Sequence, residues 1–87
     1  MQKTELEEIL KDNKPTFVKV SSSRLANIMQ YVGVELKIDK YSLDYFYEIN
    51  VEDLLKSQIP PKDIEEMASE GWCFDETKKF IKIFLTN

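Results

Sequence analysis

The sequence predicts an α+β fold: a small antiparallel sheet of about four or five strands, with about three or four short helices packed on one face. Three observations predict it. Segments that alternate apolar and polar residues are interspersed with segments of helical apolar period. Proline, glycine and serine or asparagine clusters separate these segments. The 43% hydrophobic content is sufficient for one core, so the 87 residues are read as a single domain, 1–87.

The first element is a short amphipathic helix. Thr4 and Glu7 fit a capping box, and apolar residues follow at helical spacing, which predicts a helix over residues 4–12. Pro15 stops it, because the residue before a proline avoids the helical region. A helix of this length needs a surface to pack on. Residues 1–13 are therefore also a candidate arm that docks on a partner.

A strand and a second helix follow. Thr16–Val20 is rich in β-branched residues, which favours a strand. The serines at 21–23 supply N-cap hydroxyls for a helix that we expect to end at Gly33. Its apolar stripe has the spacing i, i+3, i+4, i+7 and consists of Leu25, Ile28, Met29 and Val32.

A hairpin is predicted next. Val34–Asp39 and Tyr41–Ile49 both alternate apolar and polar residues, as half-buried strands do, with Asp39–Lys40 as the turn. A helix from residue 42 onward also fits, because several apolar residues there have a 3.6 period. The β-propensity of tyrosine, phenylalanine and isoleucine favours the strand.

The remaining chain predicts two helices and a second hairpin. Asn50 is an N-cap for a helix that Pro60 ends, and Pro61 is a favoured first residue for the next helix. Gly71 ends that helix. Trp72–Phe74 and Phe80–Leu85 are then the strands of the hairpin. The inward-facing residues of the two helices are expected to be Leu54, Leu55 and Ile59 in one, and Ile64, Met67 and Ala68 in the other.

Charge and composition limit the classes of partner. The net charge is −4, and the acidic excess lies within residues 45–87. Nucleic-acid coating needs clustered lysine and arginine, and no cluster occurs, so a basic protein partner matches better. The absence of an apolar run or export-type amino terminus predicts a cytoplasmic protein without membrane attachment. Eleven lysines against one arginine are typical of a low-GC bacterium or its phages, and a phage-encoded chain would be virion-associated.

The residues that usually carry chemistry are scarce. The chain has no histidine, one cysteine and two glycines, which argues against zinc sites, phosphate loops and histidine catalysis. Cys73 stands between Trp72 and Phe74, where a small buried hydrophobe is expected. We therefore expect no enzyme activity, no cofactor and no small-molecule substrate.

Three residue groups are candidate protein-interaction sites. The strand Phe80–Leu85 is apolar on both faces and needs cover on both, from within the chain or from a partner. A tyrosine face is expected to pack against the core, to contact a protein or, as a third possibility, to stack on nucleic-acid bases. An acidic helical face is either solvated or docks a basic partner. The strand group consists of Ile83 on one face and Phe80 and Phe84 on the other. The tyrosine group is Tyr41, Tyr45 and Tyr47, and the acidic group is Glu65, Glu66 and Glu70.

The functional expectation is a non-enzymatic interaction or structural subunit, with a protein partner or a second copy of itself. An accessory protein of a phage or mobile element is one such subunit. An acidic inhibitor or decoy of a basic nucleic-acid-binding protein is an alternative. A small regulatory nucleic-acid binder, with Arg24 and Lys19 near the contact, is another.

Overall fold

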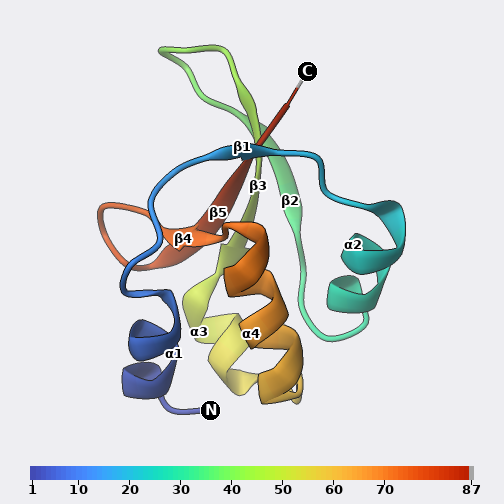
Figure 1. The fold of residues 1–87 in the computed structure, drawn as a ribbon, viewed down its shortest axis with the longest axis vertical. Helices are drawn as coiled ribbons and strands as arrows, with labels where there is room; N and C mark the ends of the chain where they lie inside the picture. The colour runs from blue at the N-terminus through green and yellow to red at the C-terminus, as the bar shows by residue number, and fades with distance from the viewer. Residues whose placement is uncertain (87) are drawn as a thin grey trace.

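The computed structural model describes residues 1–86 and confirms the α+β class, with four helices and a five-stranded sheet (Figure 1). In chain order the elements are α1 (Lys3–Leu10), β1 (Phe17–Val18), α2 (Ser22–Met29), β2 (Glu35–Ile38), β3 (Tyr45–Asn50), α3 (Val51–Lys56), α4 (Pro61–Glu70), β4 (Cys73–Phe74) and β5 (Phe80–Leu85).

Strand β5 is the centre of the sheet. The strand order is β1-β5-β3-β2, and β4 also pairs with β5. Strand β3 takes one edge of β5, while β4 and β1 follow one another along the other edge, opposite Ile81–Lys82 and Phe84–Leu85. All pairs are antiparallel except β1 with β5, so the sheet is mixed rather than wholly antiparallel. The parallel pair arises because the chain crosses from α1 to α2 in the direction of β5 (Figure 1).

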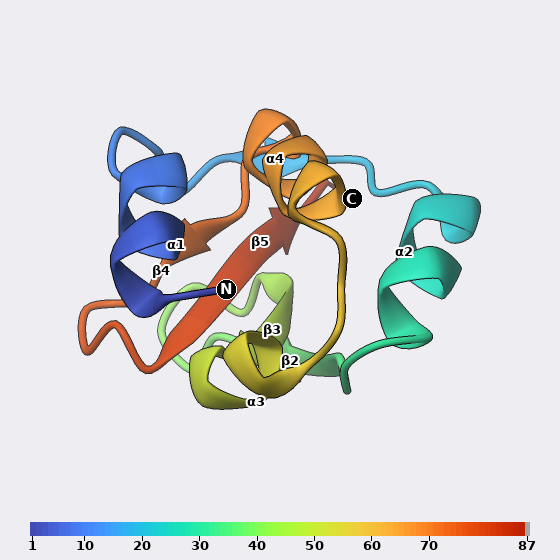
Figure 2. The ribbon, with the colours of Figure 1, turned by 90° about the horizontal axis from the view of Figure 1, so that it is seen from below.

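The core lies between the helices and one face of the sheet (Figure 2). Ile49, Ile81 and Ile83 share that face and are almost wholly buried. Trp72, at the end of α4, is also fully buried. The helices contribute the other buried side chains, chiefly Leu6 and Leu10 of α1, Ile28 of α2, Val51 and Leu54 of α3, and Ile64 and Met67 of α4.

Four helix ends match the sequence prediction. The Ser21 hydroxyl accepts a hydrogen bond from the Arg24 backbone N–H (3.2 Å) at the start of α2. The Asn50 side chain accepts one from the Asp53 N–H (2.9 Å) at the start of α3. Helix α4 begins at Pro61 and ends at Gly71, which has φ +114°.

Other helix ends differ from the prediction. Helix α3 ends at Lys56, before the predicted stop at Pro60, and the Ser57 N–H donates to the Asp53 and Leu54 carbonyls. Helix α1 begins at Lys3, and the Gln2 backbone N–H donates to the Glu5 carboxylate (3.5 Å), so Thr4 lies inside the first turn and is not the N-cap. Helix α2 ends at Gln30, and Gly33 does not adopt a positive φ. The Gln30 N–H donates to the Asn27 carbonyl (3.3 Å), and the Tyr31 and Val32 N–H groups donate to the Ile28 carbonyl (3.0 and 3.2 Å). These bonds close the helix without a left-handed residue.

The first hairpin is confirmed as two strands, with a longer connection than predicted. Residues 39–44 form the connection, so Tyr41 does not belong to the strand. All four residues of β2 are exposed, whereas strict alternation had predicted a half-buried strand. The reason is position: β2 is the last strand of the sheet, and the hairpin extends beyond the helices (Figure 1).

Helix α1 is fixed to α4 by apolar packing and by one side chain. Leu6 and Leu10 are buried in the common core. The Asn13 amide donates hydrogen bonds to the backbone carbonyls of Ala68 (2.8 Å) and Trp72 (2.7 Å), which satisfies the end of α4. The apolar stripe of residues 1–13 thus packs within the chain, and a docking role for this segment stays a prediction.

Gly71 is a position where a side chain should be costly. A Cβ there would lie 2.8 Å from Thr16 Cγ2, and φ is +114°. Gly71→Ala should lower the free energy of unfolding by about 2 kcal/mol or more, measured by urea denaturation. Gly33→Ala is the matched control, since an added Cβ meets nothing within 4 Å and φ is not positive. Equal losses in both variants would contradict this account.

Candidate interaction surface

The β2–β3 hairpin carries a group of exposed, large apolar side chains, called the hairpin patch below. The exposed fractions of its members range from 45% to 91%. The hairpin patch consists of Leu36, Ile38, Tyr41, Leu43 and Tyr45. Groups of exposed apolar side chains are candidates for contact sites. The patch is therefore the leading candidate surface.

The strand part of the hairpin patch lies on the helix-side face of the sheet. Leu36 is opposite Tyr47 and Ile38 is opposite Tyr45. Tyr45 and Tyr47 alternate with buried Ile49 on this face, as expected for residues two apart in a strand. The helices cover Ile49 fully and Tyr47 in part, and leave the rest exposed.

The loop part of the hairpin patch is held by hydrogen bonds to Asp39. The Asp39 carboxylate accepts from the backbone N–H groups of Tyr41 (2.9 Å) and Ser42 (3.0 Å), and these bonds lower the pKa of that carboxyl. The Leu43 N–H donates to the Asp39 carbonyl (2.8 Å), and Leu43 has φ +62°. Tyr41, 91% exposed, is thus presented on an ordered loop.

The predicted tyrosine group is only partly brought together. Tyr45 and Tyr47 share a face, as predicted, but Tyr41 lies on the loop. Tyr47 packs partly against the core, while Tyr45 is 45% exposed. Leu36, Ile38 and Leu43 were missed by the sequence reasoning, because alternation does not show that β2 is an edge strand whose apolar side lacks cover.

The predicted β5 group divides between the two faces of the sheet. Ile83 is buried under the helices and is not available to a partner, which corrects its place among the interaction residues. Phe80 and Phe84 lie on the opposite face and are half-buried. The Phe84 ring centre is 5.4 Å from those of both Phe17 and Phe46, so the aromatic rings cover one another.

Two lysines complete the opposite face of the sheet. Lys82 Nζ lies 5.5 Å from the Phe46 ring centre and 5.2 Å from that of Phe84. Lys37 Nζ lies 5.8 Å from the Phe80 ring centre. These are cation–π distances, and the lysine stems cover ring surface. This face is therefore largely covered by its own side chains, without a layer of helices.

The acidic group is mostly occupied within the chain. The Arg24 guanidinium of α2 forms a hydrogen-bonded ion pair with Glu66 and lies 3.3 Å from the Glu70 carboxylate, while Glu65 is exposed. Burial raises the pKa of Glu70, Arg24 opposes that shift, and Glu66 adds to it. The cluster joins α2 to α4, so Arg24 and two of the three predicted acids have structural partners. Lys19, the other predicted nucleic-acid contact, is exposed in the segment before α2.

Cys73 lies within the core at 1% exposure. Burial raises the pKa of its thiol, with a smaller opposing effect from Lys82. A thiol that is both inaccessible and protonated is a poor nucleophile. Its place in β4 agrees with the expected small buried hydrophobe.

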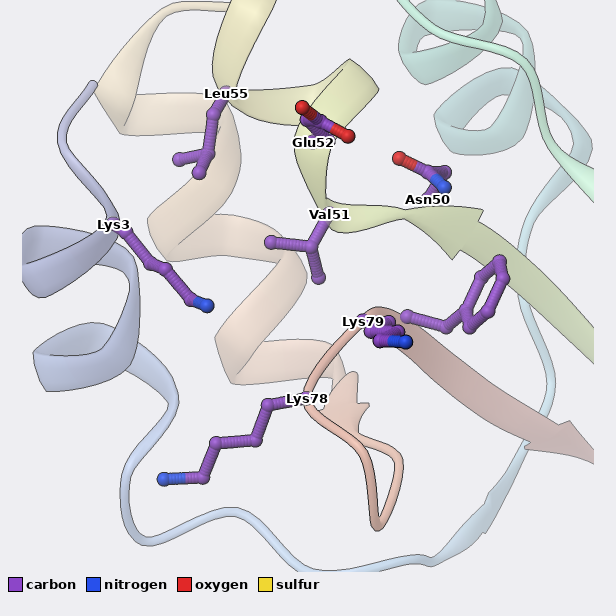
Figure 3. A pocket seen from close by; sticks show the side chains of 8 residues that line it. Lys3, Asn50, Val51, Glu52, Leu55, Lys78 and Lys79 are labelled. Carbon is purple, nitrogen blue, oxygen red and sulfur yellow. The ribbon is translucent and has the colours of Figure 1, made fainter.

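A pocket of about 500 Å³ lies where α1, the start of α3 and the β4–β5 loop meet (Figure 3). Lys3, Lys78 and Lys79 line it together with Glu52 and the apolar side chain of Val51. The lining holds no thiol or hydroxyl nucleophile and no carboxylate pair. Its residue types favour no particular reaction.

Residues 1–86 show neither a metal-binding cluster nor a membrane-spanning helix. No three Cys, Asp or Glu side chains there are grouped so as to hold a metal ion. No helix in this range is long and apolar enough to cross a bilayer. Comparison with known proteins yields no matching family model, no matching curated protein and no matching solved structure.

The Arg24 cluster makes stability depend on pH in a defined direction. Arg24→Met keeps the apolar stem but leaves Glu66 and Glu70 without their cation. The free energy of unfolding should fall by about 1–2 kcal/mol at pH 7, because these groups are only partly exposed. A carboxyl with a raised pKa costs stability when ionised, so the loss should shrink as the pH falls to about 4 and Glu70 protonates.

The measurement is urea denaturation at both pH values. Lys11→Met is the control, since the Lys11–Glu8 pair is exposed and should contribute little to stability. A loss for Arg24→Met that matches the control, or that grows on acidification, would show that the cluster does not join α2 to α4 as described.

Proposed function

We propose that this chain is a non-enzymatic protein-interaction or structural subunit whose contact surface is the hairpin patch. The observation that carries the proposal is the concentration of exposed apolar side chains on one projecting hairpin. Tyr41 and Tyr45 belong to the residue type that is enriched at interface hot spots. The Asp39 hydrogen bonds hold the loop in one conformation, which reduces the entropy lost on binding.

The edge position of β2 supports the same function. An exposed, apolar edge strand is an open template for pairing with another chain. Natural sheets protect such edges with a helix, a proline, a bulge, a short strand or charged side chains. Strand β2 is short and carries Glu35 and Lys37 on one face, while Leu36 and Ile38 on its other face are exposed. A cytoplasmic accessory protein of a phage or mobile element is a setting that fits this role and the lysine-rich composition.

The acidic decoy is supported less well. It would require the carboxylates of α4 to face a basic partner, and Glu66 and Glu70 already face Arg24. Breaking those contacts would cost the decoy part of its binding energy. Glu65 alone keeps the exposed position that the decoy needs.

A second candidate function, single-stranded nucleic-acid binding, is favoured by one observation. Phe17 is 55% exposed on the aromatic face of the sheet, next to Phe84 and near Lys82. Aromatic rings beside lysines are the usual components of base-stacking surfaces. The burial of Phe46 and the net charge of −4 weigh against this function.

The main proposal predicts that association depends on the hairpin. Ile38→Ser with Tyr45→Ser should abolish association of the chain, either with itself or with a protein from its source cells. Phe17→Ser with Met29→Ser is the matched control, because these four residues have similar exposures, from 45% to 55%. Sedimentation of the purified chain and quantitative affinity capture are the measurements. Association should persist at about 1 M salt, since the contact is apolar.

Two results would overturn the main proposal. One is association that survives the hairpin substitutions but is lost in high salt or on Glu65→Lys, which is the behaviour of the decoy. The other is a chain that stays monomeric and captures nothing.

The second candidate predicts binding of a fluorescent single-stranded oligonucleotide at low salt. Fluorescence anisotropy is the measurement, and Phe17→Ala should weaken binding by roughly tenfold, since stacking on one base contributes about 1–3 kcal/mol. Met29→Ala, at equal exposure away from the aromatic face, is the control. If the anisotropy of the oligonucleotide does not change when the unsubstituted chain is added, single-stranded nucleic-acid binding is excluded.

A further inference from the structure

Strand β2 has a free edge with its backbone groups turned outward. In the sheet β2 has β3 as its neighbour on one side and ends the strand order on the other. The Asp39 N–H donates to the Asp44 carbonyl (2.8 Å) across the hairpin. Since hydrogen-bonding direction alternates along an antiparallel strand, Lys37 and Glu35 also direct their backbone groups toward β3. Leu36 and Ile38 therefore direct theirs toward the free edge.

The two faces of β2 differ in chemistry. Leu36 and Ile38 lie on the helix-side face, whereas Glu35 and Lys37 lie on the aromatic face, opposite Glu48 and Phe46. A strand added at the free edge must match both faces, because a slip of one residue exchanges them. For a second copy of β2 related by a two-fold axis, the faces match only when a residue lies directly opposite the same residue of the other copy. The axis then passes midway between the two.

Among axes at Glu35, Leu36 and Lys37, the charges of β2 favour the one at Leu36. An axis at Ile38 would require residues 39 and 40 of the connection to pair as a strand. With the axis at Glu35, two glutamates face each other, and with the axis at Lys37, two lysines do. With the axis at Leu36, Glu35 of each copy is opposite Lys37 of the other. Leu36 is then opposite Leu36, and Ile38 is opposite Val34 of the second copy. Opposite charges and apolar pairs placed directly across strands stabilise a sheet, whereas like charges destabilise it.

This inference rests on the proposed function. We propose that the occupant of this edge is a second copy of this chain, paired antiparallel through β2, with Leu36 of one copy directly opposite Leu36 of the other across the two-fold axis. The outward backbone groups of Leu36 in each copy then exchange both hydrogen bonds. The pairing extends the sheet across the dimer and brings the strand residues of the two hairpin patches together on one face. The charges of Glu35 and Lys37 block the neighbouring registers.

Introduced cysteines test the axis directly. Cα atoms of a hydrogen-bonded antiparallel pair are about 5.5 Å apart, which is within disulfide range. Leu36→Cys should therefore give a disulfide-linked dimer under mild oxidation. Ile38→Cys is the matched control, on the same strand and face, because the two introduced thiols would be roughly 13 Å apart along the strands. Cys73 is buried and should not interfere.

Charge reversal tests the register in solution. Glu35→Lys and Lys37→Glu should each weaken self-association by roughly tenfold to a hundredfold, since two cross-strand pairs turn repulsive. The two variants mixed should form a heterodimer, and the double variant, whose net charge remains −4, should recover the homodimer. Glu35→Lys is the cleaner variant, because it removes only the 3.8 Å contact between Glu35 and Lys37, whereas Lys37→Glu also disturbs the 2.9 Å pair between Lys37 and Glu48. Sedimentation equilibrium over a concentration series is the measurement.

The outcomes separate this inference from the proposed function. A monomeric chain whose hairpin patch captures a different protein overturns the dimer and keeps the function. A dimer whose affinity is unchanged by the charge reversals, and which forms disulfides equally at both cysteine positions, overturns the register. A monomer that captures nothing overturns both.

Discussion

The structure depends on covering β5 on both faces. This strand neighbours β1, β3 and β4, and its side chains are apolar on both sides except for Lys82. Helices bury the face that carries Ile81 and Ile83. The other face has no helical layer, and Phe84 is covered there by neighbouring phenylalanines and by the Lys82 stem. Adjacent strands thus supply on that side the cover that a second layer of helices gives in larger α/β folds.

The same arrangement accounts for the exposure of the first hairpin. The helices of a chain of 87 residues cover the centre of the sheet, and little cover remains for its last strand. Tyr47 is the last residue of the hairpin to contact the core, and Tyr45 and Ile38 lie beyond it. The hairpin patch is thus the part of the apolar surface that the helices do not reach.

Much of the local structure follows from short signals in the sequence. Asn50 as an N-cap, Pro61 as a first helical residue and Gly71 as a left-handed terminus each act within one turn, so their roles are readable without knowledge of the fold. The strand and helix interpretations of residues 41–49 were separated by β-propensity. The structure confirms the strand from Tyr45 onward, while residues 41–44 lie in the connection. Predictions at Thr4 and Gly33 failed because an alternative local hydrogen bond was equally available.

The candidate surface was less predictable, for a physical reason. Alternation in Val34–Asp39 shows which side chains share a face, but burial of that face depends on which strand lies at the edge. Likewise Glu66 and Glu70 resemble a solvated face until α2 brings Arg24 to them from 42 residues away. Ile83 was predicted as an interface residue because its neighbouring sequence does not show that helices from other parts of the chain bury it.

The central place of β5 also shapes the order in which the sheet can form during translation. Strand β5 follows all its neighbours in the chain, so its pairings with β1, β3 and β4 must wait until residues 80–85 leave the ribosome. The β2–β3 hairpin pairs locally and needs none of them. An isolated two-stranded hairpin is only marginally stable, so β2 and β3 can pair early but a lasting sheet depends on the arrival of β5.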